Sequence, residues 1–254
     1  ISTKAGLTYS ITGRHILQFN TGYFEEAQPL NNVFVNIRNS NSILPARIQP
    51  ESQLTWDGSY IIRIPSFKAR LTGYATQIKH NSEKSYFFTQ SRLGDESAGF
   101  LTQTMLDAEK LHFGMELGAE YDLTASWKAS AVVSLNQYTY TNNPLLFQSS
   151  DKRLVSEPIV SYLKDYHAGQ APEHVYSLGI EYQSPHYWWV ALTANYFDKN
   201  YIGIAPSLRT ENIYLDPNTG SRCTNIDEDT VRGLLRQERL PGLFLLNATA
   251  GKSW

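Results

Sequence analysis

The chain lacks three kinds of sequence feature that would assign it to familiar classes. Its single cysteine, Cys223, excludes a disulfide framework and a thiolate metal cluster. Its 22 Lys and Arg residues are balanced by 24 Asp and Glu residues, which argues against a nucleic-acid partner. No run approaches the roughly eighteen apolar residues that a membrane-spanning helix requires. Two classes of protein remain compatible with the sequence, soluble domains and β-barrel membrane proteins.

What the chain does have is long alternation of apolar and polar residues. Between Leu111 and Tyr140, apolar side chains occupy every second position on either side of a break at Thr124, Ala125 and Ser126. This pattern predicts two antiparallel strands with one apolar and one polar face. Strands in soluble domains usually run about five to six residues, whereas a tilted strand crossing a bilayer needs about nine to eleven. Both arms reach the longer figure, so the hairpin is predicted to span a membrane.

The same pattern recurs along the rest of the chain. Further strands are predicted over 2–11, 15–23, 54–62, 67–75, 176–182, 187–197 and 243–254. Together with the hairpin they make about nine long strands. Short turns alternate with long segments, at 24–51, 79–110, 141–173 and 198–240. Soluble domains rarely contain such long connections, whereas outer-membrane barrels have short periplasmic turns and long extracellular loops.

Aromatic residues gather beside the short turns. Tyr121 and Trp127 flank one turn, and Tyr182, Trp188 and Trp189 flank another. Rings at one rim are typical of the aromatic girdle of a membrane barrel. The mean hydropathy of -0.37 fits this class, because only every second strand residue faces lipid. The sequence therefore predicts an all-β protein, an antiparallel transmembrane β-barrel with its long segments outside the cell.

Several motifs then resemble one family, the TonB-dependent outer-membrane receptors. The residues that carry the resemblance are 6–15, 68–74, 176–182, 187–189, 193–197, 204–206, 234–238 and 250–254. The similarity is greatest to the branch whose members carry a carboxypeptidase-regulatory-like domain ahead of the plug. It implies an outer-membrane barrel of about 22 strands with a plug inside. It also implies a segment that engages a TonB-type energy-transducing protein.

The chain departs from that plan, since it shows no plug, no coupling segment and too few strands. Residues 1–254 are therefore expected to be part of one barrel domain, with the plug domain and the remaining strands absent from this chain. Strand edges that stay unpaired in lipid are costly. The first and last strands are accordingly expected to pair with polypeptide outside this sequence.

Three functions are compatible with these features. The first is a receptor barrel for TonB-dependent uptake of an unidentified extracellular solute. The second is a structural or partner-binding barrel in a larger surface or secretion assembly, with a surface lipoprotein as a possible partner. The third is a soluble carbohydrate-binding β-sandwich with exposed rings as its binding platform. Outer-membrane lipid is the expected surrounding in the first two cases.

Catalytic groups are not apparent, and the chain is predicted not to be an enzyme and to need no cofactor. The six histidines have no metal-ligand spacing. Glu116 and Glu120 lie about 13 Å apart on one strand face, too far for a glycosidase pair. Rings in or near the long segments are the candidate ligand contacts, able to stack on sugar or a flat chelate; the alternative for them is girdle or loop packing. They are Tyr86, Phe87, Phe88, Tyr138, Tyr140 and Phe147.

Overall fold

The protein is described by a computed structural model that covers residues 1–38, 41–44, 49–89, 99–150, 154, 157–169, 171–216, 219–223 and 226–253. Its strands are β1 Ser2–Thr12, β2 His15–Glu26, β3 Glu51–Ile64, β4 Phe67–Thr89, β5 Gly99–Asp122, β6 Trp127–Tyr140, β7 Leu145–Ser149, β8 Ile159–Val160, β9 His174–Gln183, β10 Trp188–Asp198, β11 Asn200–Tyr201, β12 Arg239–Leu240 and β13 Leu243–Lys252. The helices are α1 Leu30–Val33, η1 Pro206–Arg209, η2 Glu211–Tyr214 and α2 Glu228–Leu234.

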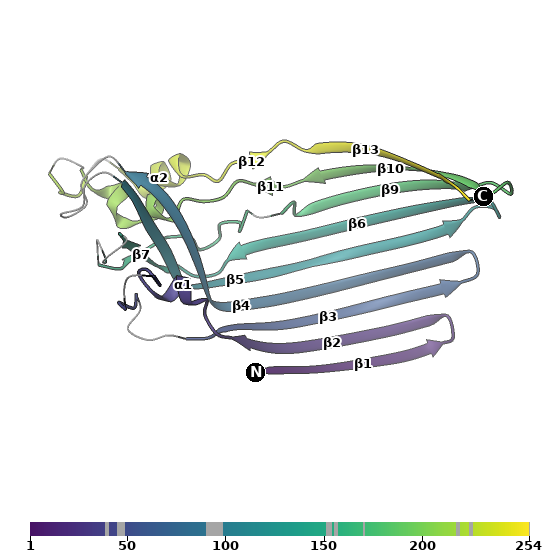
Figure 1. The fold of residues 1–254 in the computed structure, drawn as a ribbon, viewed down its shortest axis with the longest axis horizontal. Coiled ribbons are helices and arrows are strands. Elements are labelled where there is room, and N and C mark those ends of the chain that lie inside the picture. Colours follow the sequence, from purple (N-terminus) through teal and green to yellow (C-terminus); the bar gives the residue numbers. More distant parts are fainter. Residues whose placement is uncertain are drawn as a thin grey trace.

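Nine long strands form one curved antiparallel sheet, in the order β1-β2-β3-β4-β5-β6-β9-β10-β13. Figure 1 shows them side by side, with all the short turns at one end, called the turn end here, and the helices and β7 at the other, called the loop end. We call the sheet of long strands, up to residues 78 and 110 of β4 and β5, the wall. The predicted all-β antiparallel fold with about nine long strands is confirmed.

The pairing register keeps apolar side chains on one side of the wall. In the hairpin predicted from the sequence, Leu117 lies opposite Val133, and Glu116 lies opposite Ser134. Apolar positions stay aligned across strands because side chains alternate with a period of two. This face is open: Leu178 and Phe244 are 66% and 61% exposed. A soluble sandwich would need a second sheet here, and the described part of the chain places none over it.

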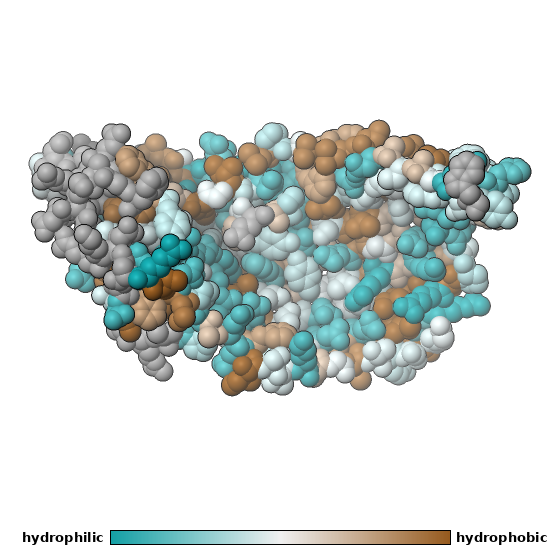
Figure 2. Space-filling view, viewed as in Figure 1, coloured by the Kyte–Doolittle hydropathy of each residue, from teal (hydrophilic) through white to brown (hydrophobic). Residues whose placement is uncertain are grey.

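The opposite face of the wall is polar. Figure 2 looks onto a side that is mostly hydrophilic over the strands, with hydrophobic residues along the margin formed by β13. A sheet with one apolar and one polar face fits a wall between lipid and a water-filled interior.

Three of the four short turns use the same local device. The hydroxyl of Thr12 accepts hydrogen bonds from the backbone N–H groups of Arg14 and His15, both at 3.2 Å. Thr124 does the same for Ser126 and Trp127 at 3.2 and 3.1 Å, and Ser184 for His186 at 3.2 Å. Such bonds satisfy N–H groups that the turn removes from the ladder. Thr or Ser at the start of a short turn is therefore a sequence signal for that turn.

β4 and β5 run beyond the wall, so the strand boundaries predicted near Lys79 and Lys110 are wrong. Most of 79–110 is a two-stranded extension that reaches Thr89 and Gly99. Figure 1 shows it leaving the wall at an angle. Beyond the wall the two strand faces are not divided between lipid and interior, so the sequence there lacks the hydropathy alternation that marks a spanning strand.

A bend separates the extension from the wall. The ladder shifts register between Ile78 and Asn81, and both His80 and Asp107 adopt left-handed backbone conformations, with φ of 56° and 61°. The two side chains hydrogen-bond to each other across the strands. Carbonyls freed by the bulge find side-chain donors: the Gln28 amide donates to His80 O, and Asn142 Nδ2 donates to Asp107 O at 2.7 Å. These bonds fix the bend.

The loop end holds nearly all of the buried apolar side chains. Met105, Ala108, Tyr140, Leu146 and Leu163 form one cluster. A second cluster consists of Val35, Leu44, Leu106 and Phe147. The long segments therefore pack on the β4–β5 extension, with β7 and β8 within 141–173 and η1, η2 and α2 within 198–240. In the described ranges, no helix is long and apolar enough to cross a membrane.

Candidate functional site

The polar face of the wall is a lattice of cross-strand hydrogen bonds. Asn20 donates to Asp57 at 2.7 Å on β2 and β3, the hydroxyls of Ser59 and Thr72 lie 2.9 Å apart on β3 and β4, and Thr55 and Thr76 repeat that contact at 3.0 Å. Each pair occupies neighbouring strands on the same face, where Cβ atoms approach to about 5 Å. The face is thus polar and extensively hydrogen-bonded across the strands.

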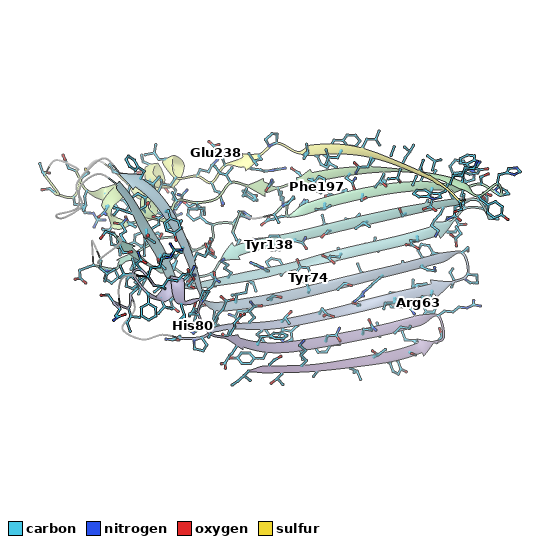
Figure 3. All side chains as sticks on the ribbon, viewed as in Figure 1. Arg63, Tyr74, His80, Tyr138, Phe197 and Glu238 are labelled. Carbon is cyan, nitrogen blue, oxygen red and sulfur yellow. The ribbon has the colours of Figure 1, made fainter. Side chains whose placement is uncertain are left out.

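Tyr74 lies near the centre of this face (Figure 3). Its hydroxyl donates to Asn136 Oδ1 at 2.8 Å, across β5. Gly114, the β5 residue between them, makes this possible: a Cβ there would lie 2.1 Å from Asn136 Oδ1 and 2.7 Å from Leu135 O. The missing side chain lets Asn136 lie flat across the strand, so Gly114 is needed for close approach.

Charge gathers on this face towards the turn end. In the strand register, Arg63 of β3 lies opposite Lys68 of β4, and Lys68 lies opposite Glu120 of β5. Arg70 donates to the hydroxyls of Ser59 and Thr72 from Nε and Nη2 at 3.0 to 3.3 Å. The basic residues of β3 and β4 therefore stand beside the acidic residue of β5, a charged lining that sequence analysis did not single out.

At the loop end a buried carboxylate joins three segments. Glu173, 2% exposed, accepts the backbone N–H of Tyr138 at 2.9 Å and contacts His167 Nδ1 at 2.7 Å. The imidazole of His167 stacks on Tyr201, with ring centroids 3.7 Å apart. The Gln237 side chain donates to the carbonyls of His167 and Ile202, both at 2.9 Å. Side chains thus replace ladder bonds where the strands become irregular.

The six rings predicted to contact a ligand do not form one surface. Tyr86 and Phe88 are 67% and 55% exposed on the β4 extension, and Phe87 between them is half-buried. Tyr138 lies on the polar face with its ring edge against His112, at 4.9 Å between centroids. The remaining two are buried in packed clusters, Tyr140 in the first and Phe147 in the second. Ligand contact by any of the six stays a prediction.

A cavity at the loop end gathers residues that sequence analysis missed. Its volume is about 510 Å³, and four basic and two acidic side chains line it. Its lining comes from Asn143, the 162–166 stretch, the 209–214 stretch, Arg222 and α2. The Tyr162 hydroxyl donates to Glu211 at 3.0 Å, and this bond to a carboxylate raises the pKa of Tyr162 above its usual value. No local pattern marks these residues, since folding of the long segments assembles them.

A hollow of about 650 Å³ lies elsewhere, on the apolar face of the wall. Gly58 and Gly73 form part of its lining, with Leu7, Phe19 and Met115 around them. An apolar surface of this kind is suited to acyl chains rather than to a polar solute. Among the described residues, no group of three or more His, Cys, Asp or Glu side chains could hold a metal ion.

No family model matches the chain, and no curated protein matches it in sequence. Solved structures share its fold, among them the following two. The copper transporter OprC has a TM-score of 0.58 at 17% identity, over 97% of this chain and 30% of that chain. The ferric-catecholate import receptor Fiu from K12 E. coli, in its closed form, has a TM-score of 0.53 at 16% identity, over 98% of this chain and 28% of that chain.

The sheet has the fold of part of a TonB-dependent receptor barrel. The chain spans less than a third of the length of either matched structure, where the matches cover 30% and 28%. One of the matched proteins is a transporter and the other an import receptor, and neither is an enzyme. The likeness at these identities concerns the fold, and the branch with the carboxypeptidase-regulatory-like domain stays a prediction.

Proposed function

We propose that this chain is part of an outer-membrane receptor barrel that takes part in TonB-dependent uptake of an extracellular solute. The observation that carries the proposal is the division of the wall into an open apolar face and a hydrogen-bonded polar face over nine long strands. Lipid on one side and a polar interior on the other account for both faces. The shared fold with a transporter and an import receptor supports the transport class.

The edges of the wall carry the second part of the proposal. β1 pairs only with β2, and β13 only with β10 along the wall, so each leaves one edge without a partner in the described chain. An unpaired edge of about ten residues in hydrocarbon costs several kcal/mol per exposed backbone group. Further barrel strands are therefore proposed to pair with both edges and to enclose a plug.

The loop end is proposed to face the outside of the cell, and the turn end the periplasm. In such barrels the longer connections are extracellular. The described parts of 24–51, 141–173 and 198–240 meet there and pack on the β4–β5 extension, which lies within 79–110 (Figure 1). A surface assembled in this way suits capture of a solute, and the extension with exposed Tyr86 and Phe88 also suits contact with a surface lipoprotein.

Uptake is tested with the full-length protein in its own outer membrane. Cells with and without the protein are incubated in a defined mixture of metal chelates, oligosaccharides and small peptides, and depletion of each solute is followed by mass spectrometry. We expect at least one solute to be depleted only when the protein is present, with depletion abolished by a protonophore and by loss of the TonB-type protein. Depletion that is unchanged by both treatments, or equal in both strains, contradicts the proposal and favours the partner-binding alternative.

A further inference from the structure

Arg209 at the loop end is a buried cation with no acidic partner among the described residues. It is 9% exposed and lines the 510 Å³ cavity. Its guanidinium is held by two backbone carbonyls: Nη2 donates to Leu235 O at 2.9 Å, and Nη1 donates to Ala205 O at 3.3 Å. Its Nε is buried and has no hydrogen-bond partner in the described part of the chain. A buried charge without a counter-charge is costly, which makes its surroundings favourable for an anion.

One of the two carboxylates that line the cavity, Glu211, already has partners. Glu211 contacts Arg222 Nη1 at 3.3 Å through Oε1 and accepts the Tyr162 hydroxyl at 3.0 Å through Oε2. Besides Glu211, the only acidic side chain that lines the cavity in the described residues is Asp165. Lys164 and Arg232 add two further positive charges, both on exposed residues. The cavity therefore has an excess of positive charge that its own acidic groups do not offset.

Apart from Asn143 and Thr210, the uncharged part of the lining is aromatic and aliphatic. The guanidinium of Arg209 lies over the ring of Tyr166, 4.8 Å from its centroid, and Arg222 lies over Tyr214 at 5.3 Å. These contacts hold the two arginine planes in fixed orientations. Val231 and Leu235 of the α2 region provide apolar surface beside them. A volume of about 510 Å³ is in the range of small-molecule sites.

We propose that this cavity binds a small organic anion, with Arg209 meeting its carboxylate or phosphate group and the tyrosine rings contacting its carbon skeleton. Arginine suits this role because its planar fork matches both groups with paired N–H donors. Nη1 and Nη2 each carry a second N–H besides the one donated to a backbone carbonyl, and such a ligand can accept these N–H groups. The site goes beyond the proposed uptake function, since anion binding at the loop end does not require passage through the barrel.

The test is isothermal titration of the purified full-length protein in detergent with citrate, inorganic phosphate and, as a neutral probe, glycerol. We expect saturable binding of citrate or phosphate, one per chain, weakened by raising the salt concentration from about 0.1 to 1 M. Glycerol should give no saturable signal. Tighter binding of citrate assigns a carboxylate ligand, and tighter binding of phosphate assigns a phosphate ligand.

Variants locate the binding. Arg209→Gln should weaken the anion about tenfold or more, because a hydrogen bond to a charged group is lost in a buried place. Arg232→Gln, on an exposed residue whose replacement leaves the fold intact, should weaken it about threefold. The matched control is Arg236→Gln, an exposed arginine next to Leu235 that does not line the cavity, and it should bind like the wild type.

Two results would overturn the site: no saturable binding of either anion, or equal affinity in wild type, Arg209→Gln and Arg232→Gln. If Arg209→Gln fails to fold, the double variant Lys164→Gln, Arg232→Gln decides the matter by the same comparison. Because binding is measured without membranes or energy, this failure is separate from a failure of uptake. Uptake without anion binding refutes the cavity alone, and anion binding without uptake refutes the transport function alone.

Discussion

The wall and the loop end are made from one chain but are stabilised by different surroundings. In the wall, apolar side chains such as Leu178 remain open and the sheet has little buried core: among its described residues the buried hydrophobic side chains are Ile61 and, at its loop-end margin, Tyr140. At the loop end, side chains such as Leu146 and Leu163 are 0% and 1% exposed. In the proposed membrane placement, lipid covers the apolar face of the wall, whereas the loop end buries its own apolar side chains, as a soluble domain does.

The largest expected difference between the two regions is in chemical access from outside the cell. In a Cys223→Ser background, Tyr86→Cys at the loop end should be labelled completely by a membrane-impermeant maleimide on intact cells. Thr124→Cys in a short turn should be labelled only after the outer membrane is permeabilised. In the wild-type protein, labelling of the native Cys223 thiol, which is partly exposed, tests the same sidedness independently. The reverse result, Thr124→Cys labelled and Tyr86→Cys protected, would overturn the sidedness.

The same truncation should have unequal effects in the two regions. Leu146→Ala leaves a cavity in a packed cluster and should cost about 2 to 5 kcal/mol of local stability, seen as faster hydrogen exchange in β5 and β7. Leu178→Ala removes a side chain that lipid covers, and lipid can fill the space, so its effect should be below about 1 kcal/mol. Equal loss of protection in both variants would remove the distinction between a self-buried and a lipid-buried region.

Charge should distinguish the two faces of the wall. Leu117→Arg places a cation on the apolar face and should cost about 2 to 4 kcal/mol in a bilayer. Ser134→Arg, one strand away on the polar face and beside Glu116, should be tolerated. The readout is the denaturant concentration at which half of the full-length protein, folded into vesicles, is unfolded. The folded fraction is measured from the difference in gel migration between heated and unheated samples. If Ser134→Arg were the more damaging variant, the two faces would be assigned in reverse.

A smaller effect is expected from the buried carboxylate of the loop end. Glu173→Ala leaves the Tyr138 N–H and the His167 side chain without their shared acceptor and should cost about 1 to 3 kcal/mol. Hydrogen exchange at the Tyr138 amide should then be faster by about tenfold or more. Glu238→Ala, an exposed acidic residue nearby, is the control and should leave that exchange unchanged. Unchanged exchange in Glu173→Ala would mean that this carboxylate does not hold the segments together.

The sequence predicts the wall well, because a strand between lipid and water shows its register directly. Alternation from Leu111 to Tyr121 and from Trp127 to Tyr140 places Leu117 opposite Val133 without any knowledge of distant contacts. The extension to Thr89 is not predictable in this way, since beyond the bend neither strand face is set by lipid. The hydropathy of the residues beyond the bend then shows no two-residue period, and in sequence the segment resembles a polar loop.

The candidate site is predicted less well, for a related reason. Tyr86 and Tyr140 are the same residue type in comparable segments, yet one is 67% exposed and the other 6%. What decides between them is the packing of Leu146 and Leu163 on β5, a long-range event that composition does not show. Arg209 escapes notice for the same reason, because its burial depends on the meeting of η1 with the 162–166 stretch and α2.

The bend at His80 and Asp107 has a consequence for how this surface can change in length. Because side chains, rather than the wall ladder, satisfy the carbonyls at the bend, the hairpin beyond it can lengthen or shorten while the wall keeps its register. Adding one residue to each of the two strands moves the part of the extension beyond the insertion outward by about 3.3 Å. A single added pair also exchanges the two strand faces, whereas two pairs restore them. The distance that the extension reaches beyond the wall is therefore adjustable in steps of two residue pairs, while the bend keeps its place at the end of the wall.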